Sequence, residues 1–85
     1  IPLVSIMPKL PRARGDKHIA AFKRAGWMVN HVEGSHHILV KEGSPIHLSI
    51  PVHSDQTLGP GLLRKLIDKA GMTPEEYLNY FYKKN

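Results

Sequence analysis

The 85-residue chain contains no cysteine, which excludes disulfide bonds and thiolate metal sites. Its apolar runs are short, and none approaches the roughly 18 residues that a membrane-spanning helix needs. Residues 1–6 are apolar but too few for the core of a secretory signal peptide. These absences fit a cytoplasmic protein with no membrane partner, and the length fits one domain.

Acidic residues are also scarce, with 7 Asp and Glu against 12 Lys and Arg and a formal net charge of +5. A small basic domain often binds a polyanion, most commonly a nucleic acid. The alternative is a lysine-rich surface that only keeps the domain soluble. Composition therefore leaves nucleic-acid binding and plain solubility open.

Prolines gather at the start of the chain, where Pro2, Pro8 and Pro11 stand among basic residues. Because proline opposes regular structure, residues 1–14 are predicted to form a flexible basic arm before a single domain over residues 15–85. Met7 is a candidate natural start, which would make residues 1–6 non-native or an upstream extension.

Three segments are predicted to be helical. The first spans residues 17–25, with Asp16 as its N-cap, Gly26 past its end and His18 on the surface. The second spans residues 60–70 and begins with a proline. Its apolar stripe consists of Leu62, Leu63, Leu66, Ile67 and Ala70. The third runs to about residue 82 and begins with the capping box Thr73-Pro74-Glu75-Glu76.

Strands are predicted over residues 27–32, 36–42 and 46–50, joined by turns at residues 33–35 and 42–45. Alternation in the last strand directs Ile46, Leu48 and Ile50 to the core, with His47 and Ser49 pointing away. Short turns imply antiparallel pairing, and the helices must cover one face of the sheet. The prediction is an α+β fold in the order α-β-β-β-α plus a C-terminal helix.

Two adjacent imidazoles, His36 and His37, follow a Gly34-Ser35 turn and open the second strand. Histidine is the usual candidate for proton transfer near neutral pH, although such a pair is more often structural or merely exposed. The glycine would let a ligand or another backbone approach closely. A metal site is a rival use if His36 and His47 approach across neighbouring strands.

Several motifs together resemble the HicA (YcfA-like) mRNA interferase toxin family. They are Ala25-Gly26-Trp27, Gly34-Ser35-His36-His37, a strand ending at Pro51, Gly61-Leu62-Leu63-Arg64-Lys65-Leu66-Ile67, and Ala70-Gly71. The resemblance runs from about residue 15 to residue 71. It implies a double-stranded-RNA-binding-domain-like fold, messenger-RNA cleavage, and a HicB-type antitoxin as partner. No cofactor is predicted. The catalytic residue of that family maps to His36, and its turn glycine maps to Gly34.

RNA contacts are predicted at Gly34, Ser35, Lys41, Arg64 and Lys65. Two other functions stay open: an RNA-binding module without catalysis, and an inactive remnant that only binds its antitoxin. The oligomeric state is open too, between a monomer and a hetero-oligomer with the antitoxin.

Consecutive strand residues point to opposite faces, so His36 and His37 cannot both meet RNA on a regular strand. The resemblance places His36 outward, which leaves His37 to pack or to form hydrogen bonds. Ile38 and Val40 would then share the outer face with His36 unless a bulge follows the Gly34-Ser35 turn.

Overall fold

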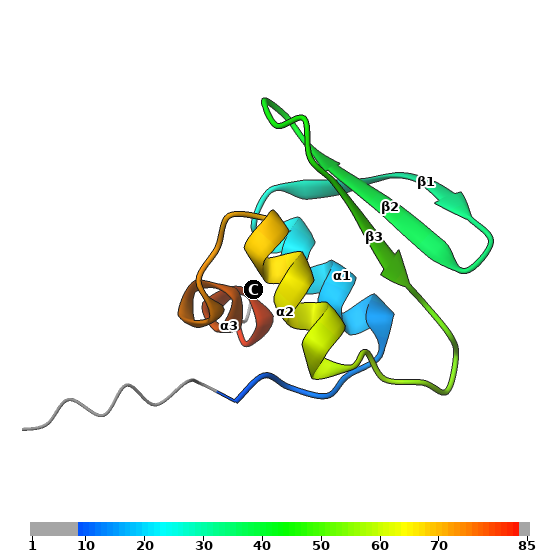
Figure 1. Ribbon diagram of the computed structural model, residues 1–85, viewed down its shortest axis with the longest axis vertical. Coiled ribbons are helices and arrows are strands. Elements are labelled where there is room, and N and C mark those ends of the chain that lie inside the picture. Colours follow the sequence, from blue (N-terminus) through cyan, green and yellow to red (C-terminus); the bar gives the residue numbers. More distant parts are fainter. Residues whose placement is uncertain (1–8, 84–85) are drawn as a thin grey trace, which may run out of the picture.

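The computed structural model describes residues 9–83, which form three helices and one three-stranded antiparallel sheet. The elements follow as α1 (Gly15–Arg24), β1 (Trp27–Glu33), β2 (His36–Lys41), β3 (His47–Pro51), α2 (Pro60–Lys69) and α3 (Pro74–Phe81). The sheet order is β1-β2-β3, and the helices lie on one side of it (Figure 1). The predicted α+β fold is confirmed, whereas the likeness to a double-stranded-RNA-binding domain stays a prediction.

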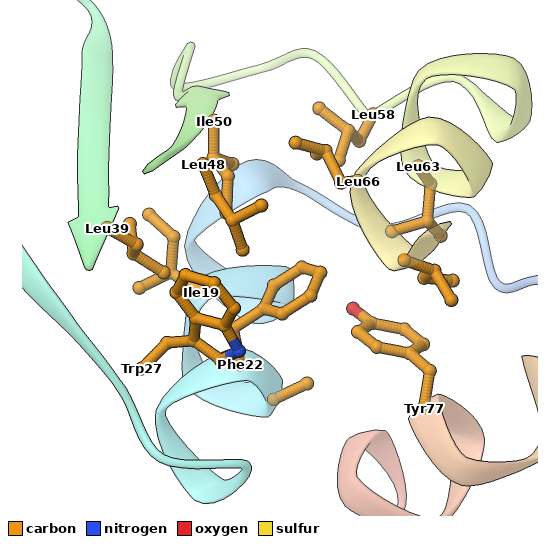
Figure 2. Close-up of a cluster of buried hydrophobic side chains, with 12 residues drawn as sticks. Ile19, Phe22, Trp27, Leu39, Leu48, Ile50, Leu58, Leu63, Leu66 and Tyr77 are labelled. Carbon is orange, nitrogen blue, oxygen red and sulfur yellow. The ribbon is translucent and has the colours of Figure 1, made fainter. Parts of the chain in front are cut away.

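The core lies between the sheet and the helices. Leu39 of β2 pairs with Leu48 of β3, and both are fully buried, as is Ile50. Phe22 of α1 and Tyr77 of α3 meet beneath the sheet with ring centroids 5.0 Å apart (Figure 2). Because α3 contributes a buried ring, the last helix belongs to the same core as the sheet.

The beginning of α1 differs from the prediction. The N-cap is Arg14 rather than Asp16, whose carboxylate accepts a bond from the Lys17 N–H inside the first turn. A Cβ on Gly15 would lie 2.2 Å from the carbonyl oxygen of Pro51. The helix therefore begins at a glycine because its first turn packs directly against the backbone at the end of β3.

The capping box of α3 is confirmed in both directions. The Thr73 hydroxyl accepts a hydrogen bond from the Glu76 N–H, and the Glu76 carboxylate accepts one from the Thr73 N–H. Two N–H groups that a helix start leaves unpaired are thereby satisfied, so this local signal was sufficient to place the helix start.

Three predicted side-chain positions are wrong. His18 is fully buried between α1 and α3 rather than on the surface, and it bonds to Tyr77. Ile46 is exposed because β3 begins one residue later, at His47. Leu62 is exposed because the buried face of α2 consists of Leu63, Leu66 and Ile67, and Leu62 lies outside that face.

Part of the predicted N-terminal arm lies outside the described residues, namely residues 1–8, which include the candidate start at Met7. Residues 9–14 run along the body of the domain. Leu10 packs against the core, and the Ala13 carbonyl accepts a hydrogen bond from the Leu58 N–H at 2.8 Å. No helix within residues 9–83 is long and apolar enough to cross a bilayer.

Candidate active site

The turn between β1 and β2 consists of two residues, Gly34 and Ser35, which separate Glu33 from His36. Gly34 has a φ of +60°, as a two-residue hairpin with glycine in its first central position requires. A Cβ at this position would meet no atom within 4 Å. The glycine is therefore explained by its backbone angle. The Ser35 carbonyl accepts a hydrogen bond from the Val52 N–H at 2.7 Å, which ties the turn to the end of β3.

The two adjacent histidines point to opposite faces of the sheet. His37 lies opposite the buried Ile50, on the side of the helices, and is half-buried. His36 is exposed on the other face, opposite Pro51. The strand β2 pairs without interruption along β3, so no bulge follows the Gly34-Ser35 turn in β2. His36 is thus presented outward by a regular strand.

The bulge of this sheet lies in β1, where the pairing register shifts between Val29 and His31. Because of this shift, His31 pairs with Ile38 and Glu33 pairs with His36. A one-residue shift exchanges the two faces of a strand. The extra residue, Asn30, therefore brings the side chains of His31 and Glu33 to the face that carries His36.

We call the face of the sheet that no helix within residues 9–83 covers the outer face. The register assigns nine residues to it in three cross-strand rows. They are Glu33, His36 and Pro51; His31, Ile38 and Ser49; and Met28, Val40 and His47. Ile38 and Val40 therefore do share this face with His36. This face is an open surface of histidines and apolar side chains with one glutamate, Glu33, and one serine, Ser49.

Three side chains on β1 form a chain of hydrogen bonds beside His36. The His31 Nε2 atom lies 2.6 Å from a carboxylate oxygen of Glu33. On the other side of the ring, the Asn30 amide nitrogen lies 2.9 Å from His31 Nδ1. His31 and Glu33 were not predicted as site residues, because Glu33 was assigned to a three-residue turn. The available signal was Gly34-Ser35 itself, because a two-residue hairpin turn with glycine first places the residues on either side of it, Glu33 and His36, opposite each other.

The comparison with family models identifies the domain. The model described as "HicA toxin of bacterial toxin-antitoxin" matches residues 15–72, more than half of the chain and all of α1 through α2. The chain belongs to the HicA toxin family. Membership makes it a toxin of a toxin–antitoxin system, with an antitoxin as its partner. The comparison with curated proteins found no match.

In this HicA-family chain, the predicted RNA contacts divide into two groups. Gly34 and Ser35 adjoin His36 in the hairpin. Lys41 is at the other end of β2, which at about 3.3 Å per residue places it about 17 Å from His36. It also faces the helices, with its Cε atom next to Gly26.

Arg64 and Lys65 belong to α2, on the helix side of the sheet (Figure 1). The structure therefore does not bring Lys41, Arg64 and Lys65 together with His36.

An arginine paired with an aspartate lies close to the hairpin, in another part of the HicA domain. A cleft of about 240 Å³ is lined by Arg14, Asp16, Val52, His53 and Ser54. Val52 is the residue that bonds to the turn, so this cleft begins where the hairpin meets β3. The Arg14 guanidinium is exposed, with its Nε atom 3.4 Å from Asp16. The sequence analysis did not single out this cleft, because it joins residues from two distant segments.

His36 and His47 do not approach each other across the neighbouring strands, as the alternative metal site would require. His36 pairs with Pro51 and His47 pairs with Val40, so the two histidines lie about 13 Å apart along the strands. Within residues 9–83 there is no group of three His, Cys, Asp or Glu side chains that could hold a metal ion.

Proposed function

We propose that this HicA-family toxin is an mRNA interferase, an endoribonuclease that cleaves messenger RNA with His36 and without a metal ion. The observation that carries the proposal is an exposed imidazole on the outer face, beside a tight hairpin turn, in a domain of this family. The net charge of +5 supports a polyanionic substrate. The proposal places the toxin in the cytoplasm, where messenger RNA and the antitoxin are found.

The chemistry needs few protein groups because RNA carries its own nucleophile. The 2′-hydroxyl attacks the neighbouring phosphorus, the bond from phosphorus to the 5′ oxygen breaks, and a 2′,3′-cyclic phosphate and a 5′-hydroxyl form. One group must take the 2′-hydroxyl proton and another must supply a proton to the leaving oxygen. A positioned proton-transfer group typically contributes a factor of about 10² to 10⁴ in rate. An exposed site with His36 therefore suits a slow endonuclease.

Binding is proposed to involve a wider surface than cleavage. Gly34 and Ser35 would contact the RNA next to the scissile phosphate, whereas Lys41, Arg64 and Lys65 would contact phosphates elsewhere along the strand. A HicB-type antitoxin is the proposed protein partner, and the toxin would be a monomer without it and part of a hetero-oligomer with it.

The proposal is tested by comparing the wild type, His36→Ala and His47→Ala on one RNA in the presence of EDTA. His47 is a matched control because it is an exposed histidine on the same outer face. We expect wild-type cleavage from the control and none from His36→Ala. A substrate with a 2′-deoxy residue at the scissile position should resist all three proteins. Equal cleavage by wild type and His36→Ala would refute the role of His36.

A wild type that binds RNA without cleaving it would instead support the RNA-binding module. A wild type that binds only its antitoxin would support the inactive remnant. Cleavage that requires added divalent metal would refute the metal-independent reaction.

A further inference from the structure

We infer that Glu33 is the second proton-transfer residue of this site, the group that takes the 2′-hydroxyl proton while His36 protonates the leaving oxygen. The inference rests on the proposed function, since it assigns the proton acceptor of the same reaction. Three features of β1 carry it: the pairing of Glu33 with His36, the bulge at Asn30, and the hydrogen bonds that hold the carboxylate.

Glu33 and His36 are direct cross-strand partners at the end of the hairpin. The Cβ atoms of such partners lie roughly 4.5 to 5.5 Å apart and point to the same face. The Glu33 side chain is 70% exposed, so an RNA strand can reach it. A phosphodiester that contacts the His36 imidazole therefore also comes within reach of the Glu33 carboxylate.

The bulge is what creates this arrangement. Val29 faces the helices opposite Leu39, so regular alternation would place Asn30 outward, His31 inward, Val32 outward and Glu33 inward. The inserted residue reverses this order beyond Val29, which turns Val32 to the helix side of the sheet, where it is still exposed, and Glu33 to the outer face. Bulges often re-aim side chains next to active sites. Here the bulge replaces an apolar neighbour of His36 with a carboxylate.

The hydrogen bonds of His31 fix the carboxylate in place. With the Asn30 amide nitrogen as donor, His31 Nδ1 is the acceptor, at a distance of 2.9 Å. The ring hydrogen is then on Nε2, which donates to Glu33 Oε2 at 2.6 Å. His31 thus acts as a positioning residue. Its hydrogen bond holds the Glu33 carboxylate beside the His31 ring on the same strand.

The roles follow from the chemistry of the two groups. An ionised carboxylate only accepts hydrogen bonds, whereas an imidazolium donates them. In the step proposed here, Glu33 receives the proton of the 2′-hydroxyl as its oxygen bonds to phosphorus. The bond from phosphorus to the 5′ oxygen breaks, and that oxygen receives a proton from His36. Transfer of the proton from Glu33 to His36 through water restores both groups.

The first test uses Glu33→Gln, which keeps the shape of the side chain and removes the proton acceptor. Its control is Glu42→Gln, another exposed glutamate, in the turn after β2. Single-turnover cleavage at saturating RNA should be about 10² to 10⁴ slower for Glu33→Gln, with little change in the concentration that half-saturates the rate. Glu42→Gln should match the wild type. A Glu33→Gln protein that cleaves at the wild-type rate would overturn the inference.

The second test separates the roles with an RNA whose 5′ bridging oxygen at the cleavage site is replaced by sulfur. A thiolate leaves without a proton, so this substrate needs no proton donor. His36→Ala should regain most of its lost rate on the sulfur substrate, and Glu33→Gln should not. Recovery by Glu33→Gln would overturn its assignment as the proton acceptor.

The positioning role of His31 has its own readout. His31→Ala should slow cleavage in the wild type but have no further effect in Glu33→Gln, because His31 acts through the carboxylate. An equal loss in both backgrounds would refute that role.

The two proposals fail in different ways. If the wild type and Glu33→Gln cleave equally while His36→Ala does not, only the inference about Glu33 falls. If the wild type cleaves no RNA, the proposed function falls and the inference falls with it.

Discussion

The stability of this domain should depend strongly on pH because of one buried histidine, His18. Its side chain is fully buried where α1 meets α3, and its Nδ1 atom lies 2.5 Å from the Tyr77 hydroxyl. The Phe81 ring packs 5.3 Å from it. Nδ1 and the hydroxyl share this hydrogen bond, and the other ring nitrogen, Nε2, has no partner within residues 9–83. Burial lowers the pKa of His18 from 6.5 to about 4.

The sign of the effect follows from comparing the folded and unfolded chains. As the pH falls through 6.5, His18 takes up a proton in the unfolded chain but stays neutral in the folded chain until about pH 4. The contribution of His18 to the free energy of unfolding is therefore fully present above pH 6.5 and is lost progressively down to about pH 4. At about 1.4 kcal/mol per unit, the difference corresponds to about 3 kcal/mol. The whole free energy of unfolding of a small domain is only about 5 to 15 kcal/mol.

Urea unfolding between pH 7 and pH 4 tests this expectation, with fluorescence of Trp27, the single tryptophan, as the signal. The comparison is with His18→Leu, which has a similar volume and cannot take a proton. This variant should be less stable at pH 7 by about 1 to 3 kcal/mol because the buried Tyr77 hydroxyl loses its hydrogen-bond partner. Its stability should nevertheless fall by about 3 kcal/mol less than that of the wild type on acidification. Parallel losses in the two proteins would refute the reasoning, since the other histidines are common to both.

Three further outcomes follow from the structure. In thermal melts, Gly15→Ala should destabilise the domain by more than about 2 kcal/mol, since its Cβ would lie 2.2 Å from the Pro51 oxygen. Gly61→Ala is the control and should be neutral or stabilising, because its Cβ would meet nothing within 4 Å. His36→Ala should stay within about 0.5 kcal/mol of the wild type, and the half-buried His37 should cost more when truncated to alanine, as circular dichroism melts would reveal. RNA affinity should fall steeply with salt in a filter-binding titration if phosphate contacts dominate; a flat dependence would contradict that binding mode.

Local sequence patterns predicted most of the fold because they report on local structure. The capping box placed α3, and alternation placed Leu48 and Ile50 in the core. His18 escaped prediction because its burial depends on a residue 59 positions away in the sequence, Tyr77. No pattern around His18 reveals that a helix beyond the matched family stretch covers it.

The candidate site was predicted only in part for a related reason. The outward position of His36 followed from its resemblance to the HicA pattern. The cross-strand neighbour of His36 was not predicted. A turn over residues 33–35 would pair His36 with Val32, whereas the observed two-residue turn and the bulge at Asn30 pair His36 with Glu33. A single inserted residue changes the chemistry of a whole strand face, and a bulge has only a weak sequence signal.

The composition of the outer face also separates cleavage from electrostatic binding. None of its nine residues is lysine or arginine, although the chain has 12 such residues in all. Met28, Ile38 and Val40 occupy much of the surface around the histidines instead. Net charge alone therefore does not locate the reaction that we propose. In the proposed function, phosphates along the strand are held by cations off this face, so charge variants should act on binding, and Glu33 and His36 should act on the chemical step.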